Sequence, residues 1–300
     1  DPTEHLSVKM AAKQYPLKIT SCYLDKIKKG DPEDPLLLQV LPQAEETYVT
    51  PNEKADPVGD IQATLIPGLI QKYPNRVLIY TNPDCGIHCR FCFRRNSNNQ
   101  LKSLSGGPEP IIRHLANDTS IHEVILSGGE PLLLERDRLM HLFDNLESIP
   151  HIKRIRIHTR IPVCDPCQID SQLLDRFTRL SKTLSIVVHC NHPQEICHQT
   201  SQAFNSLNRN GVHLFSQTVM LRRINDRPEI LTELFEHLFM HGVIPYYLHL
   251  LDPAPGTSHF HVPDHEALSL WKTLQERLPG YLVPRLVREI GGKPCKQIII

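Results

Sequence analysis

The stretch VLIYTNPDCGIHCRFCFRR, residues 77–95, joins an apolar run typical of a β-strand to a loop that contains three cysteines. Cys85, Cys89 and Cys92 form the pattern C-x3-C-x2-C, and two arginines follow directly. A disulfide uses two cysteines, and a structural zinc ion usually takes four ligands. A set of three thiolates at this spacing suits a cubane iron–sulfur cluster in which one iron keeps an open coordination position.

Five further apolar runs of this kind follow the first one. The six runs start at residues 77, 123, 154, 184, 213 and 244, so after the first gap a new run begins about every 30 residues. This spacing is typical of strand–helix–strand units. The segments 135–149 and 227–242 carry apolar side chains at helical spacing. Six successive units predict an α/β fold, a partial (β/α)6 barrel of parallel strands.

Two parts are expected along the chain. Residues 1–60 are rich in turn-forming residues and predict a preface of helix and loop, whereas residues 61–300 contain the barrel and a short C-terminal segment. In such barrels the chemistry occurs at the C-terminal ends of the strands. The residues at these ends are the three cysteines, the motif SGGEP (127–131), Arg160, His189, Gln217 and Asp252.

Composition excludes several classes of protein. The formal net charge is zero and no long basic run occurs, which argues against a general nucleic-acid or membrane-surface binder. No apolar run reaches the length of a membrane span. The nine cysteines are an odd number in a long chain, which favours a reducing, cytoplasmic location with cysteines that bind metal or pack.

An alternative for the cysteines is a four-cysteine zinc site. Cys89 and Cys92 would combine with the second C-x2-C pair, Cys164 and Cys167. The two pairs are separated by 71 residues, far more than in zinc ribbons, and this set leaves Cys85 unused. We therefore expect Cys164 and Cys167 to be packing residues located away from the triplet, and the same holds for the other four cysteines: Cys22, Cys190, Cys197 and Cys295.

The cysteine triplet and the motif SGGEP together resemble the radical S-adenosyl-L-methionine (SAM) superfamily. The resemblance implies that Ser127, Gly128, Gly129 and Glu130 approach the amino group of SAM. More narrowly, residues 57–296 resemble the lysine 2,3-aminomutase family, through the stretches YPNRVLIYTNPDCGIHCRFCFRR, IRIHTRIPV, SQTVMLRRIND and PYYLHLLD. The stretches 27–41 and 280–292 are similar to the branch of that family that makes β-lysine for elongation factor P.

The resemblance implies three cofactors: a [4Fe-4S] cluster, SAM and pyridoxal 5'-phosphate (PLP). A lysine must then bind PLP, and the C-terminal run GGKPCK offers Lys293 and Lys296, of which Lys296 matches the family position. Arg76 and Tyr73 match residues that bind the PLP phosphate, and Lys72 stands where the family has arginine. The phosphate site is therefore expected at residues 72–76.

The same matching implies the remaining roles. Arg160, His189 and Gln217 match the SAM pocket, and Arg94 matches the arginine that pairs with the substrate carboxylate, a geometry that suits a guanidinium group. Asp252 and Glu289 fall at the two acids that bind the ε-ammonium of lysine.

The implied reaction is a radical isomerisation that converts L-α-lysine to β-lysine, by moving nitrogen from C2 to C3. The implied partners are the small-molecule substrate lysine, an electron donor such as flavodoxin or ferredoxin, and, through the product, elongation factor P. Two alternatives remain at this point. One is a radical SAM aminomutase that acts on glutamate or arginine, and the other is a non-catalytic zinc-binding interaction protein.

Overall fold

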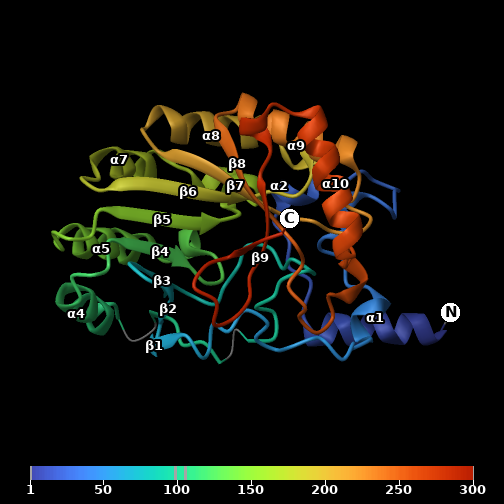
Figure 1. Cartoon of the computed structure of the whole chain (residues 1–300), viewed down its shortest axis with the longest axis horizontal. Coiled ribbons are helices and arrows are strands. Elements are labelled where there is room, and N and C mark those ends of the chain that lie inside the picture. The colour runs from blue at the N-terminus through green and yellow to red at the C-terminus, as the bar shows by residue number, and fades with distance from the viewer. Residues whose placement is uncertain (1, 98–99, 105–106, 300) are drawn as a thin grey trace.

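A single curved sheet organises the chain in the computed structural model, which describes residues 2–97, 100–104 and 107–299 (Figure 1). Within these residues the strands follow one another in chain order. They are β1 (Thr64–Ile66), β2 (Leu69–Tyr73), β3 (Arg76–Tyr80), β4 (Glu123–Ser127), β5 (Arg154–Thr159), β6 (Thr183–His189), β7 (His213–Val219), β8 (Val243–His249), β9 (Arg285–Arg288) and β10 (Gln297–Ile298).

Strands β3 to β8 are the six strands predicted from the apolar runs. Each pairs in parallel with the next, so their C-terminal ends lie along one rim of an incomplete barrel. The predicted α/β fold with a partial parallel barrel is therefore confirmed. The predicted helices at 135–149 and 227–242 are observed as α5 (Arg136–Glu147) and α9 (Pro228–Met240).

The other helices are mostly connections between strands, and several cover the outer face of the sheet (Figure 1). They are α1 (Pro2–Gln14), α2 (Ser21–Leu24), α3 (Pro35–Leu38), α4 (Glu109–Asn117), α6 (Ile161–Cys164), α7 (Ser171–Arg179), α8 (His198–Arg209) and α10 (Asp264–Arg277). Short 3-10 turns are η1 (Ala44–Thr47), η3 (Pro131–Leu133), η4 (Pro166–Gln168), η5 (Pro193–Glu195), η6 (Ser258–Phe260) and η7 (Gly280–Leu282). No helix in the described ranges is long and apolar enough to cross a membrane.

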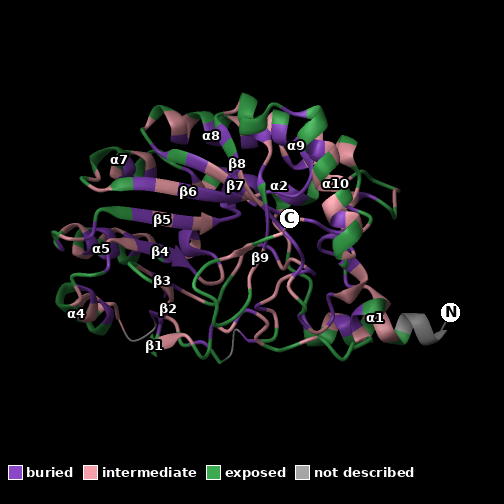
Figure 2. Ribbon diagram, in the orientation of Figure 1, coloured by how far each residue is buried: buried purple, intermediate pink, exposed green. Residues whose placement is uncertain are grey.

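Strand alternation separates the hydrophobic core from a polar interior. Successive side chains of a strand point to opposite faces. In β5, Ile155 and Ile157 are fully buried in the core between sheet and helices, while Arg156 and His158 alternate with them and line a cavity on the other face. Figure 2 shows the buried strands beneath helices that are exposed on their outer sides.

Two short antiparallel hairpins at the sheet edges are absent from the sequence predictions. Strands β1 and β2 precede the parallel set, and β9 and β10 follow it. Strands of two to five residues carry too few alternating positions to stand out in the sequence. The second hairpin matters for the site because Glu289 follows β9 and Lys296 precedes β10, which brings both residues to one short loop.

The preface packs against the cysteine loop. Arg90, which lies between two of the cysteines, is fully buried, and its Nε donates a hydrogen bond of 2.8 Å to Oε1 of Glu46. Its Nη1 donates to the carbonyl of Tyr15 at 2.6 Å. A buried arginine of this kind needs such partners because an unpaired buried charge is costly. The preface therefore helps to hold the loop, and the division of the chain at residue 60 stays a prediction.

Candidate active site

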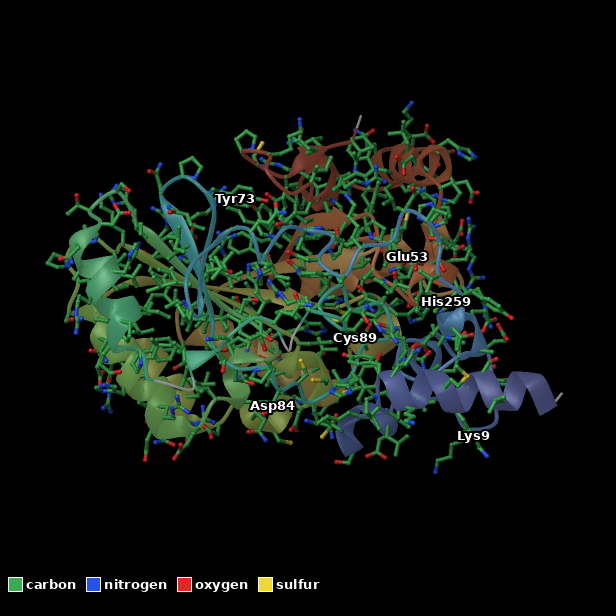
Figure 3. The ribbon with its side chains drawn as sticks, turned by 90° about the horizontal axis from the view of Figure 1, so that it is seen from below. Lys9, Glu53, Tyr73, Asp84, Cys89 and His259 are labelled. Carbon is green, nitrogen blue, oxygen red and sulfur yellow. The ribbon has the colours of Figure 1, made fainter. Side chains whose placement is uncertain are left out.

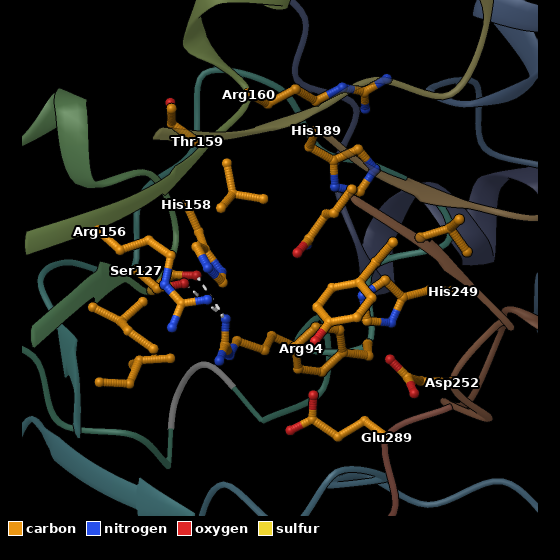
Figure 4. A pocket seen from close by; sticks show the side chains of 18 of the residues that line it. Arg94, Ser127, Arg156, His158, Thr159, Arg160, His189, His249, Asp252 and Glu289 are labelled. Atoms are coloured by element: carbon orange, nitrogen blue, oxygen red, sulfur yellow. Dashed lines mark hydrogen bonds between the residues drawn. The ribbon is translucent and has the colours of Figure 1, made fainter. Parts of the chain in front are cut away.

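A cavity of about 800 Å³ opens at the C-terminal ends of the parallel strands. Figure 3 shows Cys89 between the strands and α1, and Figure 4 shows the cavity from close by. A volume of this size is at the upper end for sites that bind small molecules. Its lining contains every residue that the sequence singled out: Lys72, Tyr73, Arg76, Cys85, Cys89, Cys92, Arg94, Ser127, Gly128, Gly129, Glu130, Arg160, His189, Gln217, Asp252, Glu289 and Lys296. The fold brings these residues together, and the role of each stays a prediction.

The three cysteines of the triplet line one end of this cavity. In the described structure the sulfur atoms of Cys85, Cys89 and Cys92 do not all lie within 4.8 Å of one another. A single zinc ion with Zn–S bonds of about 2.3 Å would require sulfurs roughly 3.8 Å apart. Three thiolates from one loop are a donor set that suits a cluster of several irons.

The second cysteine pair does not complete a zinc site with the triplet. Cys167 is exposed and lies beside Cys22 instead. Cys164 is buried and packs in the core as predicted, but it also lines the cavity near the cysteine loop. The prediction that Cys167 is a packing residue is therefore wrong, although it lies away from the triplet as expected, and Cys164 packs as predicted but lines the same cavity as the triplet. The four-cysteine zinc alternative is not formed in the described structure.

The glycines of SGGEP allow a close approach of two backbones. Gly128 has φ of +133°, and a Cβ there would lie 2.8 Å from the carbonyl oxygen of Asn82. A Cβ on Gly129 would overlap the backbone of Pro83 and Asp84. The amide of Gly129 donates to the Asn82 carbonyl at 2.8 Å. Only glycine fits this contact, which holds the start of the cysteine loop against the end of β4.

Glu130 uses its carboxylate to tie β4 to the end of β5. The carboxylate accepts hydrogen bonds from Oγ1 of Thr159 at 2.6 Å and from the backbone amide of Arg160 at 2.8 Å. Burial raises the pKa of Glu130 to about 7, and these hydrogen bonds oppose the shift. The side chain thus orients the residue that follows β5, in addition to any contact with SAM.

Arg160 links the preface to the cysteine loop. Its Nη1 donates to Sγ of Cys89 at 2.7 Å. Its Nη2 contacts Oε1 of Gln39 at 2.7 Å, Oε2 of Glu195 at 2.9 Å and the hydroxyl of Tyr23 at 3.1 Å. The guanidinium therefore provides a fixed positive charge beside one sulfur, and preface residues hold it there.

His189 and Gln217 lie side by side, because they are register partners on β6 and β7. Burial, followed by the nearby charge of Arg160, lowers the pKa of His189 to about 3, so the imidazole is neutral. Its ring lies 5.5 Å from that of Phe91, centroid to centroid. The Nε2 atom has no hydrogen-bond partner among the described residues and remains available to a ligand.

A chain of alternating charges runs along one wall of the cavity. Nε of Arg94 lies 2.8 Å from Oδ2 of Asp60, and Nζ of Lys72 lies 2.5 Å from Oδ1 of the same carboxylate. Nζ of Lys72 also lies 2.7 Å from Oε1 of Glu289, whose other oxygen pairs with Lys296. The last residue of the predicted preface, Asp60, thus connects the residues expected at both ends of the substrate.

Asp60 could not have been chosen from the sequence. It is 1% exposed, and although burial alone would raise its pKa, Arg94 and Lys72 hold the pKa below its usual range. For Glu289 burial likewise opposes ionisation, but the ammonium groups of Lys296 and Lys72 keep its pKa well below the ordinary value. Both carboxylates are therefore charged.

Asp252 lies near Glu289 and forms no salt bridge within the described part of the chain, although Lys296 and Lys72 are close enough to oppose the rise of its pKa. Its Oδ1 has no hydrogen-bond partner among the described residues. Burial, together with the charge of Glu289, raises the pKa of Asp252 to about 7. Figure 4 shows the two carboxylates on the same side of the cavity, opposite Arg160. A half-buried carboxylate of this kind is a ready acceptor for a cationic ligand.

Other polar residues of the cavity were missed. His158 is half-buried and His249 is buried, and desolvation lowers the pKa of each well below its usual value. Arg156 and Arg285 add positive charge near Arg76, whose guanidinium lies 4.8 Å from the ring centre of Tyr73. A signal was present in the sequence, because polar residues alternate with apolar ones in RIRIHT, the strand β5.

Comparison with known proteins agrees with this arrangement. A domain family described as a 4Fe-4S single cluster domain matches residues 75–208, which confirms the prediction of a cluster. L-lysine 2,3-aminomutase of Escherichia coli (strain K12) is 40% identical over 294 residues, which are 97% of this chain and 85% of that protein. The enzyme of the same name from Haemophilus influenzae is 39% identical and covers 96% of this chain and 86% of its own length.

More distant relatives extend the comparison. L-lysine 2,3-aminomutase of Clostridium subterminale is 32% identical over 96% of this chain and 70% of that protein. A radical SAM methyltransferase from Sphaerobacter thermophilus has the same fold, with a TM-score of 0.50 and 15% identity over 73% of this chain and 68% of that chain.

The cofactor set expected from the sequence, a [4Fe-4S] cluster with SAM and PLP, is the set that the radical SAM lysine 2,3-aminomutases use. Identity of about 40% over nearly the whole length places the chain among them. The chain belongs to the radical SAM lysine 2,3-aminomutase family of isomerases.

Proposed function

We propose that this chain is a PLP-dependent L-lysine 2,3-aminomutase that converts L-α-lysine to β-lysine. The observation that carries the proposal is the pair of half-buried carboxylates, Asp252 and Glu289, in the same cavity as Arg94 and Lys296. Lysine has a carboxylate at one end and an ammonium group at the other. The cavity offers an arginine for the first and two acids for the second.

The two ends of the substrate can be assigned to separate groups. Arg94 keeps Nη1 directed toward Ser127 and Gly128, with contacts of 3.4 Å to each, while Asp60 holds the rest of its guanidinium. The long contacts leave Nη1 free to bind a substrate carboxylate. In the described structure the ammonium of Lys296 pairs with Glu289, which shows that this carboxylate accepts an alkylammonium group.

When bound, the cluster and SAM supply the radical that starts hydrogen transfer, and PLP supplies the carbon that holds the substrate amine. Cys85, Cys89 and Cys92 would hold three irons, and the fourth iron would face the cavity. The motif of residues 127–130, with Arg160, His189 and Gln217, would surround SAM. Lys296 would hold PLP, and Arg76, Tyr73 and Lys72 its phosphate. The residues mainly position the reacting groups and exclude water.

Lys72 has a second role in this scheme. Its ammonium lies between Asp60 and Glu289, at 2.5 Å and 2.7 Å. If Lys296 held PLP, Glu289 would lose a positive partner, and Lys72 would keep this half-buried carboxylate from being left without one. The substrate ammonium can then take the place of Lys296 beside Glu289.

The two acids should control affinity for lysine. We expect Asp252→Asn and Glu289→Gln each to raise KM for lysine about 10- to 150-fold, because each removes a charged hydrogen bond worth about 1.5–3 kcal/mol. Steady-state kinetics under anaerobic conditions measures this effect. Asp264→Asn is a matched control, because Asp264 pairs with Arg288 at the surface. An unchanged KM in Asp252→Asn would contradict the assignment of the ammonium site.

This assignment also predicts a pH dependence. Since the pKa of Asp252 is about 7, its carboxyl is largely neutral at pH 6 and charged at pH 8. The substrate ammonium, with a pKa of about 10.4, is charged throughout this range. Lysine affinity should therefore rise as the pH increases through 7, and this rise should disappear in Asp252→Asn. A persistent rise in the variant would show that another group is responsible.

Asp60 should act as a positioning residue. We expect Asp60→Asn to raise KM for lysine by about 10-fold or more and to change kcat less, because Arg94 and Lys72 lose their shared counter-charge. Asp56→Asn is the control, since Asp56 accepts hydrogen bonds from the amides of Asp60 and Ile61 but does not touch Arg94. Equal changes of KM in both variants would show that loop geometry, and not charge, matters.

The reaction itself is tested by an anaerobic assay with SAM, PLP and dithionite. Lysine, arginine and glutamate are offered separately, and the products are identified by mass spectrometry and chromatography. We expect β-lysine from lysine and no product from glutamate, whose second acid would be repelled by the two carboxylates. Conversion of arginine or glutamate without conversion of lysine would overturn the proposal.

We further propose that the product serves the modification of elongation factor P in the cytoplasm. The stretches 27–41 and 280–292 support this use, and the nine free cysteines suit a reducing compartment with flavodoxin or ferredoxin as electron donor. Deletion of the gene should leave elongation factor P without its β-lysyl group, and added β-lysine should restore the group. Full modification in the deletion strain would contradict this use.

A further inference from the structure

Three potential metal ligands converge outside the active-site cavity. They are Cys22 on α2, Asp165 between α6 and η4, and Cys167 on η4. One ligand atom of each lies within 4.8 Å of the others, and in the described part of the chain no other group of three histidine, cysteine or acidic residues meets this criterion. Cys22 is 143 positions away from Asp165 in the sequence, so only folding brings it to Asp165 and Cys167.

The geometry is close to that of a tetrahedral site. Sγ of Cys22 lies 3.8 Å from Oδ1 of Asp165. With Zn–S bonds of about 2.3 Å and Zn–O bonds of about 2.0–2.2 Å, a tetrahedral ion sets its sulfur and oxygen ligands roughly 3.5 Å apart. The observed distance between Sγ of Cys22 and Oδ1 of Asp165 is therefore only a few tenths of an ångström longer than in an ideal zinc site. Cys167 is exposed, which leaves a fourth position open to water.

The carboxylate in this group has no cation beside it among the described residues. Its Oδ2 accepts a hydrogen bond of 3.2 Å from Nε2 of Gln168, and its Oδ1 faces the thiol of Cys22. Two thiols and one carboxylate that converge in this way form a donor set of the kind that zinc takes, because thiolate ligands select zinc over hard cations such as Mg²⁺.

We propose that Cys22, Asp165 and Cys167 bind a zinc ion, with water as the fourth ligand. The site joins the preface to the connection that follows β5, independently of the iron–sulfur cluster.

A zinc ion at this position would also affect the residues around the cluster. The neighbouring residue Tyr23 accepts a hydrogen bond from Arg160, which in turn contacts Cys89. The same preface segment is already attached nearby, because Thr20 donates to the carbonyl of Cys164 and Nζ of Lys26 donates to the carbonyl of Val163 at 2.6 Å. A metal bond beside these contacts would fix the segment that orients Arg160.

The test uses the full chain, purified anaerobically with its cluster reconstituted to four irons and then offered one equivalent of Zn²⁺. Zinc and iron per chain are measured by mass spectrometry, and X-ray absorption at the zinc edge gives the zinc ligands without interference from iron. We expect one zinc ion with two sulfur ligands at about 2.3 Å and oxygen ligands in the remaining positions. This measurement on the unaltered protein does not depend on how any variant folds.

Variants locate the ion. Cys22→Ser and Cys167→Ser should reduce bound zinc from one ion per chain to nearly none while the iron content stays the same, and Asp165→Asn should weaken binding at least 10-fold. Cys197→Ser, which changes a thiol outside the group, should keep the zinc. The proposal is overturned by zinc with three or four sulfur ligands, by zinc that persists in Cys22→Ser, by a Cys22–Cys167 disulfide in the anaerobic protein, or by no bound zinc.

Discussion

Lys296→Ala should abolish covalent binding of PLP and lower kcat by roughly 10³-fold or more, since the lysine is expected to hold the cofactor. Lys296 lines the cavity at the start of β10, and its ammonium pairs with Glu289. The cluster absorbs visible light, so PLP attachment is best measured after borohydride reduction. Mass spectrometry of the reduced protein then identifies the labelled peptide. The iron content should not change.

Two other lysines serve as controls for this result. Lys293 is exposed in the turn before Lys296, so Lys293→Ala should keep the label and the activity. Lys72 lines the same cavity, but we expect it to contact the PLP phosphate and Glu289, so Lys72→Ala should weaken PLP binding without moving the label. A label on Lys293 or Lys72 in the unaltered protein would show that the register of the C-terminal segment is wrong.

Replacing Cys85, Cys89 or Cys92 singly by alanine should remove the cluster and reduce activity below detection. A cluster held by three thiolates keeps only two in each variant. Iron and sulfide content and the electron paramagnetic resonance signal of the reduced protein measure the loss. PLP binding at Lys296 is a separate readout, which distinguishes loss of the cluster from unfolding.

Cys164→Ala is the matched control for the triplet. Cys164 is buried and lines the same cavity, so its surroundings resemble those of the three proposed ligands. Its replacement should leave four irons per chain, because an open iron is needed for SAM. Loss of the cluster in Cys164→Ala would mean that four cysteines hold it, and the open-iron arrangement would then be wrong.

The barrel was predictable because its signals are local. Each parallel strand is a run of apolar, β-branched residues, and helices α5 and α9 carry apolar residues at helical spacing, so both could be placed from a few neighbours. The cysteine triplet is also local, since three ligands fall within eight residues of one loop. The hairpins β1–β2 and β9–β10 were missed because such short strands have no clear period.

Ion pairs between residues that are far apart in the chain could not be predicted from the sequence. Asp60 ends a loop with no apolar pattern, and only folding shows that it holds Arg94 and Lys72. Arg95 follows the triplet, and no sequence pattern indicates that its side chain is only 3% exposed and that its Nη2 lies 2.6 Å from Oε2 of Glu46. Ion pairs depend on the distance between side chains from separate elements, which a linear pattern does not contain.

By itself the sequence determined the parallel barrel and the cysteine triplet that is proposed to hold the cluster, because strand period and motif spacing act over short stretches of chain. Only the tertiary structure decided which of the charged residues in the cavity form ion pairs. Burial raises the pKa of Asp252 to about 7 while lysines hold that of Glu289 low, although both are acids near strand ends. The meeting of Cys22 with Cys167 was likewise decided by folding, because desolvation and proximity exist only once distant segments pack.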